Sequence, residues 1–226
     1  MNEVNLQRAY YAETAEKYDG MHAPEPLALA FLDTAIEMLG AASVLEIGSG
    51  TGKVTEHLIE RHPRAKITGI EPVAELRAIA LKRGVNLLDG DATRMAFADA
   101  SFDLVCCNSV LHHIRHPEVA VAEMLRVSRL GIFICDDNNF AQGRLWVRAI
   151  KQAAHLLGLW PLANFIKTRG RGYLVTEGDG IAYSYSLFNN YAQLRAGCRT
   201  VHLLNLSNTG PNLYRSAAKL ALLGVK

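Results

Sequence analysis

Short apolar runs and amphipathic segments alternate between residues 43 and 135. The apolar runs are typical of strands buried on both faces, and the segments between them repeat apolar residues at helical spacing. Because strand and helix patterns alternate, we expect a mostly parallel sheet with helices on both faces. The expected strands cover residues 43–47, 66–70, 85–88, 102–107 and 130–135, and the helices between them cover residues 53–61, 73–83 and 118–126.

The flanking regions follow a looser pattern. Residues 5–18 and 24–39 read as two helices ahead of the first strand, and Gly40 ends the second. After residue 135 the alternation lapses, and residues 140–186 contain one expected helix, over 144–157, and glycine-rich turns. A helix over residues 186–195 and strands over 200–206 and 219–225 follow, with a connector at 208–212 short enough for antiparallel pairing.

The length of 226 residues suits one α/β domain and is short for two. We therefore interpret residues 1–226 as a single domain. Residues 1–40 would form helices ahead of the sheet, which the family resemblance described below identifies as lid helices, and residues 140–186 would form a substrate-cap insertion between the fifth and sixth strands.

Composition indicates an ordinary intracellular enzyme. The chain has 24 Lys and Arg against 22 Asp and Glu, and a net charge of +2 supports neither nucleic acid nor an anionic membrane as a partner. Its four cysteines form no C-x-x-C pair, which suits reduced, buried thiols. No segment reaches the ~20 apolar residues of a membrane span, and the first residues lack a signal-peptide pattern. We expect a cytoplasmic protein with no membrane span.

A glycine-rich loop is the most specific chemical signal in the chain. Residues 44–53 read VLEIGSGTGK, so a short strand runs into Gly48, Gly50 and Gly52 and then into a helix. Glycine permits positive φ and a close approach of the backbone to a ligand. The amides beyond the loop face a helix N-terminus, which suits polar or anionic groups.

Two nucleotide-binding patterns do not fit this loop. A P-loop would need glycine at Ile47 and Ser or Thr at Val54. A dinucleotide fingerprint starting at Gly48 would need glycine where Lys53 stands. The remaining pattern, E-x-G-x-G-x-G from Glu46 to Gly52, resembles motif I of the class I S-adenosylmethionine-dependent methyltransferases.

Further residues carry the same resemblance, which covers residues 43–136 well and the remainder in outline. Glu71 ends the second expected strand, Gly90-Asp91-Ala92 matches the family's third element, and Asn108 follows the fourth strand. One departure is Arg126–Gly131, which has no proline where relatives usually carry a Pro-Gly-Gly turn. The resemblance implies a Rossmann-like seven-stranded sheet, order 3-2-1-4-5-7-6, with an antiparallel last strand.

The resemblance also implies S-adenosylmethionine as the cofactor and no metal. Glu71 would accept the ribose hydroxyls, Asp91 the adenine amine, and Asn108 would lie near the methionine end; Tyr18 belongs to the lid. The implied cofactor-binding residues are Tyr18, Glu46, Gly48, Ser49, Gly50, Gly52, Glu71, Pro72, Asp91, Ala92 and Asn108.

The candidate catalytic residues are His112 and His113. Because they are adjacent, we expect them to point in different directions, with at most one facing the acceptor. Methyl transfer is an in-line displacement that needs a base only if the acceptor must lose a proton. His22 or Asp137 could also serve, and the polar residues 136–139 are either active-site groups or a solvated loop.

Residues 140–186 carry more apolar side chains than a solvated excursion needs. They favour a cap over a partly apolar acceptor, or else a homodimer interface. Arg169 and Arg171 could hold an acidic group of the acceptor or form a solvated turn. The apolar residues are Leu145, Trp146, Ile150, Leu156, Leu157, Leu159, Trp160, Phe165 and Ile166.

The leading hypothesis is methyl transfer to a small molecule, with oxygen favoured over carbon or nitrogen as the acceptor atom. One alternative is a non-catalytic module that binds the cofactor or its product and acts through a protein partner. Another is a different transfer from the sulfonium, such as aminopropyl transfer. An RNA methyltransferase is a further alternative, although a basic stripe with interleaved aromatic residues is missing.

Overall fold

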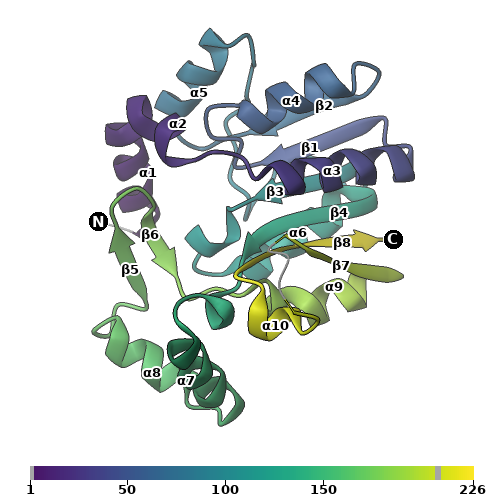
Figure 1. Cartoon of the computed structure of the whole chain (residues 1–226). Coiled ribbons are helices and arrows are strands. Elements are labelled where there is room, and N and C mark those ends of the chain that lie inside the picture. Colours follow the sequence, from purple (N-terminus) through teal and green to yellow (C-terminus); the bar gives the residue numbers. More distant parts are fainter. Residues whose placement is uncertain (1–2, 207–209) are drawn as a thin grey trace.

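The computed structural model describes residues 3–206 and 210–226, and these residues form a central six-stranded sheet (Figure 1). Its order is β2-β1-β3-β4-β8-β7. The first four strands are parallel, and β8 runs antiparallel to both β4 and β7. The strands are β1 Ser43–Ile47, β2 Lys66–Ile70, β3 Phe102–Asn108, β4 Ser128–Asp137, β7 Thr200–Asn205 and β8 Lys219–Val225. The predicted mostly parallel sheet with an antiparallel last strand is confirmed.

Residues 85–88, predicted as an edge strand, pair with β2 through Leu88 alone. The Leu88 N–H donates to the Gly69 carbonyl at 2.9 Å, and the Leu88 carbonyl accepts the Glu71 N–H at 3.0 Å. Val85 cannot extend the pairing because its N–H donates to the Ala80 carbonyl and closes the preceding helix. The sheet therefore has one strand fewer than predicted, in the otherwise expected order.

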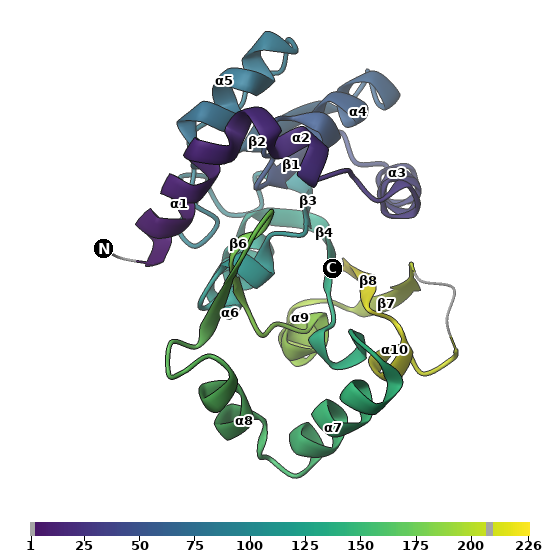
Figure 2. The same cartoon turned by 60° about the vertical axis from the view of Figure 1, so that its left-hand side comes forward.

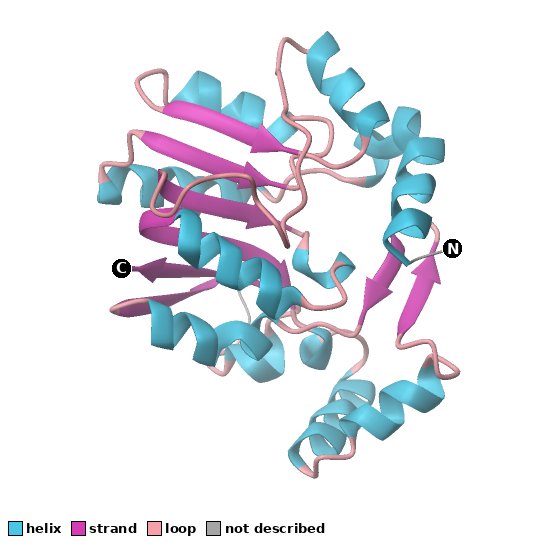
Figure 3. Ribbon diagram, turned by 180° about the vertical axis from the view of Figure 1, so that it is seen from behind, coloured by secondary structure: helices cyan, strands magenta, loops and turns pink. Residues whose placement is uncertain are grey.

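Helices cover both faces of the sheet (Figure 3). On one face α3 and α4 pack against side chains such as Leu104 and Phe133, and on the other α6 and α9 pack against Val105 and Ile132. Neighbouring strand residues point to opposite faces, which explains why the predicted strands are apolar throughout. These helices are α3 Pro26–Leu39, α4 Lys53–Arg61, α6 Pro117–Val127 and α9 Tyr191–Gly197; α5 Ala74–Lys82 follows β2.

Two details agree with the sequence. The four cysteines are buried and free, as expected of reduced thiols. Where relatives carry Pro-Gly-Gly, α6 ends at Val127 and β4 begins at Ser128, so no separate turn is present. Gly131 lies close to β8, since a Cβ there would stand 2.6 Å from the Gly224 carbonyl oxygen.

The N-terminal region is helical for slightly longer than predicted. It consists of α1 Glu3–Thr14, the 3-10 turn η1 Ala15–Lys17 and α2 Tyr18–Met21. Tyr11 and Ala15 pack against Val73 and Leu76 at the start of α5. This contact holds the N-terminal helices beside the ends of the sheet strands.

The region after β4 contains elements that the sequence did not predict. The predicted helix is α7 Leu145–Leu156, and α8 Trp160–Lys167 follows it. A hairpin of β5 Tyr173–Thr176 and β6 Gly180–Tyr183 then reaches α1 (Figure 2). The 3-10 turns η2 Leu111–His113, η3 Asn139–Ala141 and η4 Leu187–Asn190 and the short α10 Leu213–Ser216 complete the described elements.

The connector before β8 and the absence of a membrane span were also expected from the sequence. The connector at 208–212 includes residues 208 and 209, which lie outside the described residues. Among the described helices, none combines the length and the apolar character that crossing a bilayer would require.

Candidate active site

One cavity of about 730 Å³ lies at the carboxyl ends of the parallel strands. Ile47 of β1, Glu71 after β2, Asn108 of β3 and Asp137 of β4 all line it. In open α/β sheets this edge is the usual place for a ligand, and the volume is typical of small-molecule sites, about 300–1,000 Å³. The opposite wall comes from α1, α2 and the β5–β6 hairpin, through residues such as Tyr11 and Asp179.

The glycine loop has the positive φ angles that its sequence predicts. The φ angles are 66° at Gly48, 56° at Gly50 and 80° at Gly52. A Cβ on Gly50 would stand 2.7 Å from the Tyr18 hydroxyl oxygen, so the ring of Tyr18 lies over the loop. A Cβ on Gly52 would instead meet Ala80 at 3.0 Å, so Gly52 allows the loop to pack beside α5.

Apart from Gly50 and Gly52, every predicted cofactor-binding residue lines the cavity. Glu71 is buried, and its two carboxylate oxygens accept the N–H groups of Gly50 and Val73, each at 2.9 Å. Burial raises the pKa of this carboxyl, against the effect of the two N–H donors. Glu71 therefore joins the glycine loop to the start of α5.

Glu46 is the second buried carboxyl beside the loop. The Thr55 hydroxyl donates to it, and the Glu46 side chain is almost fully enclosed. Burial raises the pKa of Glu46 to about 7, although the hydrogen bonds from Thr55 and Ser49 oppose that shift. At neutral pH the Glu46 carboxyl is therefore protonated in a substantial fraction of molecules.

Asp91 and Asn108 stand further along the same wall. Asp91 Oδ1 accepts the Thr93 N–H at 2.9 Å, and its Oδ2 lies 3.3 Å from the Arg8 guanidinium. The Nδ2 of Asn108 is buried and has no hydrogen-bond partner among the described residues. A buried amide donor without a partner is costly, which makes Asn108 a candidate for contact with a ligand.

His112 and His113 both line the cavity, so the expectation that at most one would face it is wrong. They lie in the tight turn η2, which brings their ring centroids to 3.9 Å. His112 Nδ1 is 2.7 Å from Asp136 Oδ1, and His113 Nδ1 is 2.7 Å from the Ile181 carbonyl oxygen. Each ring is therefore held through Nδ1 and presents Nε2 to the cavity.

The two histidines carry different charges. Burial lowers the pKa of His112, but Asp136 outweighs burial and raises it to about 10. Burial and the neighbouring charge of His112 lower the pKa of His113 to about 4. At neutral pH His112 is thus an imidazolium, and His113 is neutral. The Ile181 carbonyl 2.7 Å from His113 Nδ1 assigns the proton to that nitrogen and the lone pair to Nε2.

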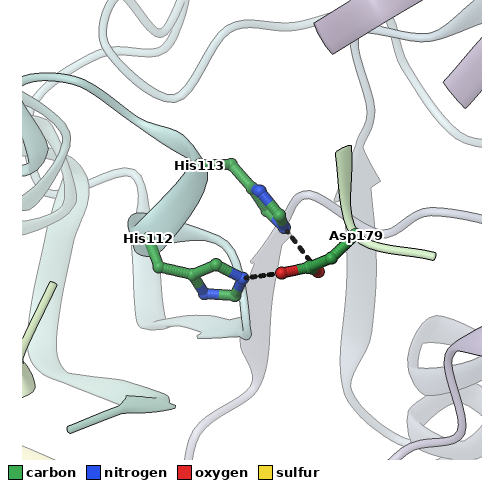
Figure 4. A group of neighbouring side chains, drawn as sticks. All are labelled: His112, His113 and Asp179. Carbon is green, nitrogen blue, oxygen red and sulfur yellow. Dashed lines mark ion pairs between the residues drawn. The ribbon is translucent and has the colours of Figure 1, made fainter. Parts of the chain in front are cut away.

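Asp179 completes this group from the tip of the hairpin (Figure 4). Its carboxylate oxygens lie 3.6 Å from His112 Nε2 and 3.5 Å from His113 Nε2, and both histidines lower its pKa to about 2 despite burial. The ligand atoms of the three residues lie within 4.8 Å of one another, a spacing that would accommodate a hydroxyl oxygen or a cation. No sequence pattern links residues 112 and 179, so Asp179 was missed; it was read only as part of a turn.

Hydrogen bonds tie the hairpin to α1 over the cavity. The Gln7 Oε1 accepts the Ile181 N–H, and the Tyr10 hydroxyl accepts the Gly178 N–H at 2.6 Å. The Tyr11 hydroxyl donates to the Asp179 carbonyl at 3.2 Å and lies 3.1 Å from His113 Nε2. The hairpin and α1 therefore cover together the end of the cavity at which His112 and His113 lie.

Other predicted residues divide into two groups. His22 and Asp137 line the cavity, as does Tyr18, whereas Arg169 and Arg171 are exposed and lie outside its lining. The apolar side chains of α7 and α8 are absent from the lining as well, and the part of residues 140–186 that lines the cavity is the β5–β6 hairpin.

The polar residues 136–139 are not a solvated loop. Asp136, Asn138 and Asn139 are buried, and Asp137 lines the cavity. Besides contacting His112, Asp136 accepts the N–H groups of Val110 and Leu111 at 3.1 and 2.8 Å. The sequence marked this segment but did not single out Asp136 as the partner of His112.

The sequence of the chain is similar to those of known methyltransferases. Residues 45–135 match the family described as "Methyltransferase domain". The chain is 31% identical over 109 residues to a demethylmenaquinone methyltransferase of Thermobifida fusca, covering 45% of this chain and 46% of the relative. It is 26% identical over 152 residues to a ubiquinone biosynthesis O-methyltransferase of Pectobacterium atrosepticum, covering 64% and 62%. The chain spans less than two thirds of the length of these curated relatives.

Solved structures share the fold at low sequence identity. Magnesium protoporphyrin IX methyltransferase from Synechocystis PCC 6803, solved with bound S-adenosylmethionine, superposes with a TM-score of 0.62 at 11% identity, covering 100% of this chain and 98% of that one. A possible histamine N-methyltransferase from Thermotoga maritima gives 0.59 at 16% identity, covering 97% and 99%. These likenesses establish the fold over essentially the whole chain.

Proposed function

We propose that this chain, which matches the methyltransferase family over residues 45–135, transfers the methyl group of S-adenosylmethionine to an oxygen of a small-molecule acceptor. The observation that carries the proposal is the placement of the glycine loop, Glu71, Asp91 and Asn108 around one cavity at the ends of successive strands. Two curated relatives are named for demethylmenaquinone methylation and for ubiquinone biosynthesis. Their names support a small and partly apolar acceptor.

The cofactor would lie along the wall formed by β1, β2 and β3. The Glu71 carboxylate has lone pairs beyond those that bind Gly50 and Val73, and these would accept ribose hydroxyls. Asp91 Oδ2 would accept the adenine amine, and the unpaired Asn108 Nδ2 would donate to the methionine end. The bound sulfonium supplies the electrophilic methyl group.

The acceptor would lie at the end of the cavity formed by η2 and the hairpin. His113 Nε2 is neutral and would accept the hydrogen bond of an acceptor hydroxyl, at the place that the Tyr11 hydroxyl takes in this structure. The imidazolium of His112 would stabilise negative charge on the acceptor oxygen as its proton leaves. The helix α1 and the hairpin would exclude water and hold the reacting groups in line.

Isothermal titration with S-adenosylmethionine tests the shared basis of this proposal. We expect the wild-type chain to bind and Gly50→Arg to lose binding, because a side chain there displaces Tyr18 from the loop. Circular dichroism of the variant checks that it folds. Absence of binding to the wild type would reject the proposal.

Turnover then separates the proposed activity from its alternatives. We expect S-adenosylhomocysteine to form with a metabolite extract. Binding without turnover on any extract would indicate a non-catalytic module, and product that forms only with RNA would indicate an RNA methyltransferase. Methylthioadenosine in place of S-adenosylhomocysteine would indicate transfer of the sulfonium's amino-acid side chain, as 3-amino-3-carboxypropyl from S-adenosylmethionine or as aminopropyl from its decarboxylated form.

A further inference from the structure

The helix α7 is oriented with its polar side toward the protein. The Arg148 guanidinium donates to the Arg215 carbonyl, the Lys151 ammonium to the Asn139 carbonyl at 2.7 Å, and the Gln152 amide to the Phe140 carbonyl at 2.9 Å. These hydrogen bonds attach α7 to the rest of the protein through its polar side. A surface helix normally turns its polar side toward water.

The opposite side of α7 is apolar and faces outward. Trp146 is 62% exposed, Ile150 61% and Leu156 84%, and on α8 Phe165 and Ile166 are 61% and 67% exposed. We call the outward side chains of Leu145, Trp146, Ile150, Leu156, Phe165 and Ile166 the outer apolar face. Both helices lie away from the central sheet, at the end of the molecule below the hairpin (Figures 1 and 2). An exposed apolar surface of this extent indicates a binding surface.

The charged residues in the segment that carries the outer apolar face are all basic. Residues 138–176 contain six of the chain's 24 Lys and Arg and none of its 22 Asp and Glu. Arg144, Lys167, Arg169 and Arg171 are exposed at the ends of the two helices. The mild net charge of the whole chain therefore conceals a basic, apolar segment.

We propose that α7 and α8 dock on the surface of an anionic lipid membrane. The outer apolar face would enter the boundary between headgroups and acyl chains, and the exposed basic side chains would contact the lipid phosphates. Pairing with a second copy is disfavoured because it would bring two basic segments together. This proposal does not depend on the proposed methyl transfer.

Vesicle co-sedimentation tests the proposal with the untagged full chain. We expect binding to vesicles of equimolar phosphatidylglycerol and phosphatidylcholine to be about tenfold tighter, or more, than to phosphatidylcholine alone, and to weaken at high salt. Equal binding to both vesicles, or no binding to either, would overturn the proposal.

Variants locate the contact. The double variant W146E/I150E should lose vesicle binding, whereas L81E and M38E should retain it, since Leu81 and Met38 are comparably exposed but lie on α5 and α3. Circular dichroism checks that each variant folds. Light scattering tests the alternative occupant, a second copy of the chain. If the wild type forms a concentration-dependent dimer, W146E/I150E abolishes that dimer and no vesicles are bound, the face is a dimer interface and membrane docking is overturned.

Tryptophan fluorescence gives an independent readout, because both tryptophans of the chain, Trp146 and Trp160, lie in these two helices. Trp160 packs on Phe140, with ring centroids 5.2 Å apart, so W160F isolates the exposed Trp146. We expect a blue shift of the W160F emission when the anionic vesicles are added. An unchanged emission spectrum would contradict insertion of Trp146.

Discussion

A single residue, Glu71, holds the glycine loop and is also proposed to bind the cofactor. In this structure it accepts the N–H groups of Gly50 and Val73, and in the proposed complex it also binds ribose. We expect Glu71→Ala to weaken S-adenosylmethionine binding by about 1–3 kcal/mol, through lost hydrogen bonds, in isothermal titration. Glu75→Ala, exposed on α5, is the matched control. An unchanged affinity in Glu71→Ala would remove Glu71 from the cofactor site.

His113 is the residue proposed to accept the acceptor's proton. We expect His113→Asn to lower kcat about 10²-fold or more while the affinity for S-adenosylmethionine stays the same, because the histidine lies at the acceptor end. Asn keeps a side-chain polar group but cannot take up the proton. His202→Asn, exposed on β7 and outside the cavity lining, should behave as wild type in steady-state assays. Full activity of His113→Asn would show that no base acts at this position.

At the scale of elements, the hairpin over the cavity depends on a few hydrogen bonds to α1. In Gln7→Ala the Ile181 N–H loses its acceptor, which is worth about 1 kcal/mol, or roughly a fivefold change in the opening equilibrium. We expect faster hydrogen exchange at residues 178–181 by mass spectrometry. Gln193→Ala, which loses a bond to the Glu118 carbonyl far from the hairpin, should leave that exchange unchanged. Equal rates in Gln7→Ala and wild type would mean that other contacts hold the hairpin.

Elements with a strong internal pattern could be predicted, and those defined by tertiary contacts could not. The strands β1 and β2 match their predicted bounds because residues that interrupt a strand follow closely, Gly48 after β1 and Pro72 after β2. The helix α8 was missed because Pro161 reads as a break, although proline is well accommodated in the first turn of a helix. The strands β5 and β6 are four residues long, too short to show alternation, and their pairing with each other and with α1 becomes visible only in three dimensions.

At the scale of the whole molecule, the buried carboxyl of Glu46 links stability to pH. Its raised pKa means that the folded state holds a proton that the unfolded chain releases. We therefore expect the free energy of unfolding to fall by on the order of 3 kcal/mol as pH rises from about 4.5 to about 7, and Glu46→Gln to remove this part of the slope. Urea unfolding at several pH values measures it. Glu60→Gln, exposed on α4, should keep the wild-type slope, and a shared slope in all three proteins would contradict the assignment.

The sequence identified the residues that line the β1–β3 side of the cavity better than the partners of His112 and His113. Glu71 and Asn108 directly follow the expected strands 66–70 and 102–107, so the topology alone brings them to one edge, and Asp91 comes three residues after the segment 85–88 that pairs with β2 at Leu88. Asp179 lies 67 positions after His112, on a hairpin without a pattern of its own, and only the folded chain joins them. The roles assigned to all these residues stay predictions until they are measured.

Because Asp179 lies on the hairpin, movement of the hairpin would change both access to the cavity and the charge at its entrance. While the hairpin is closed, this carboxylate offsets the positive charge that His112 holds beside Asp136. Any opening of the hairpin carries that negative charge away and leaves the entrance more positive. An acceptor that is already partly ionised would be attracted to the open form. Closure would then place it beside the Asp179 carboxylate, and under the proposed O-methylation that charge would favour an uncharged product over an anionic acceptor.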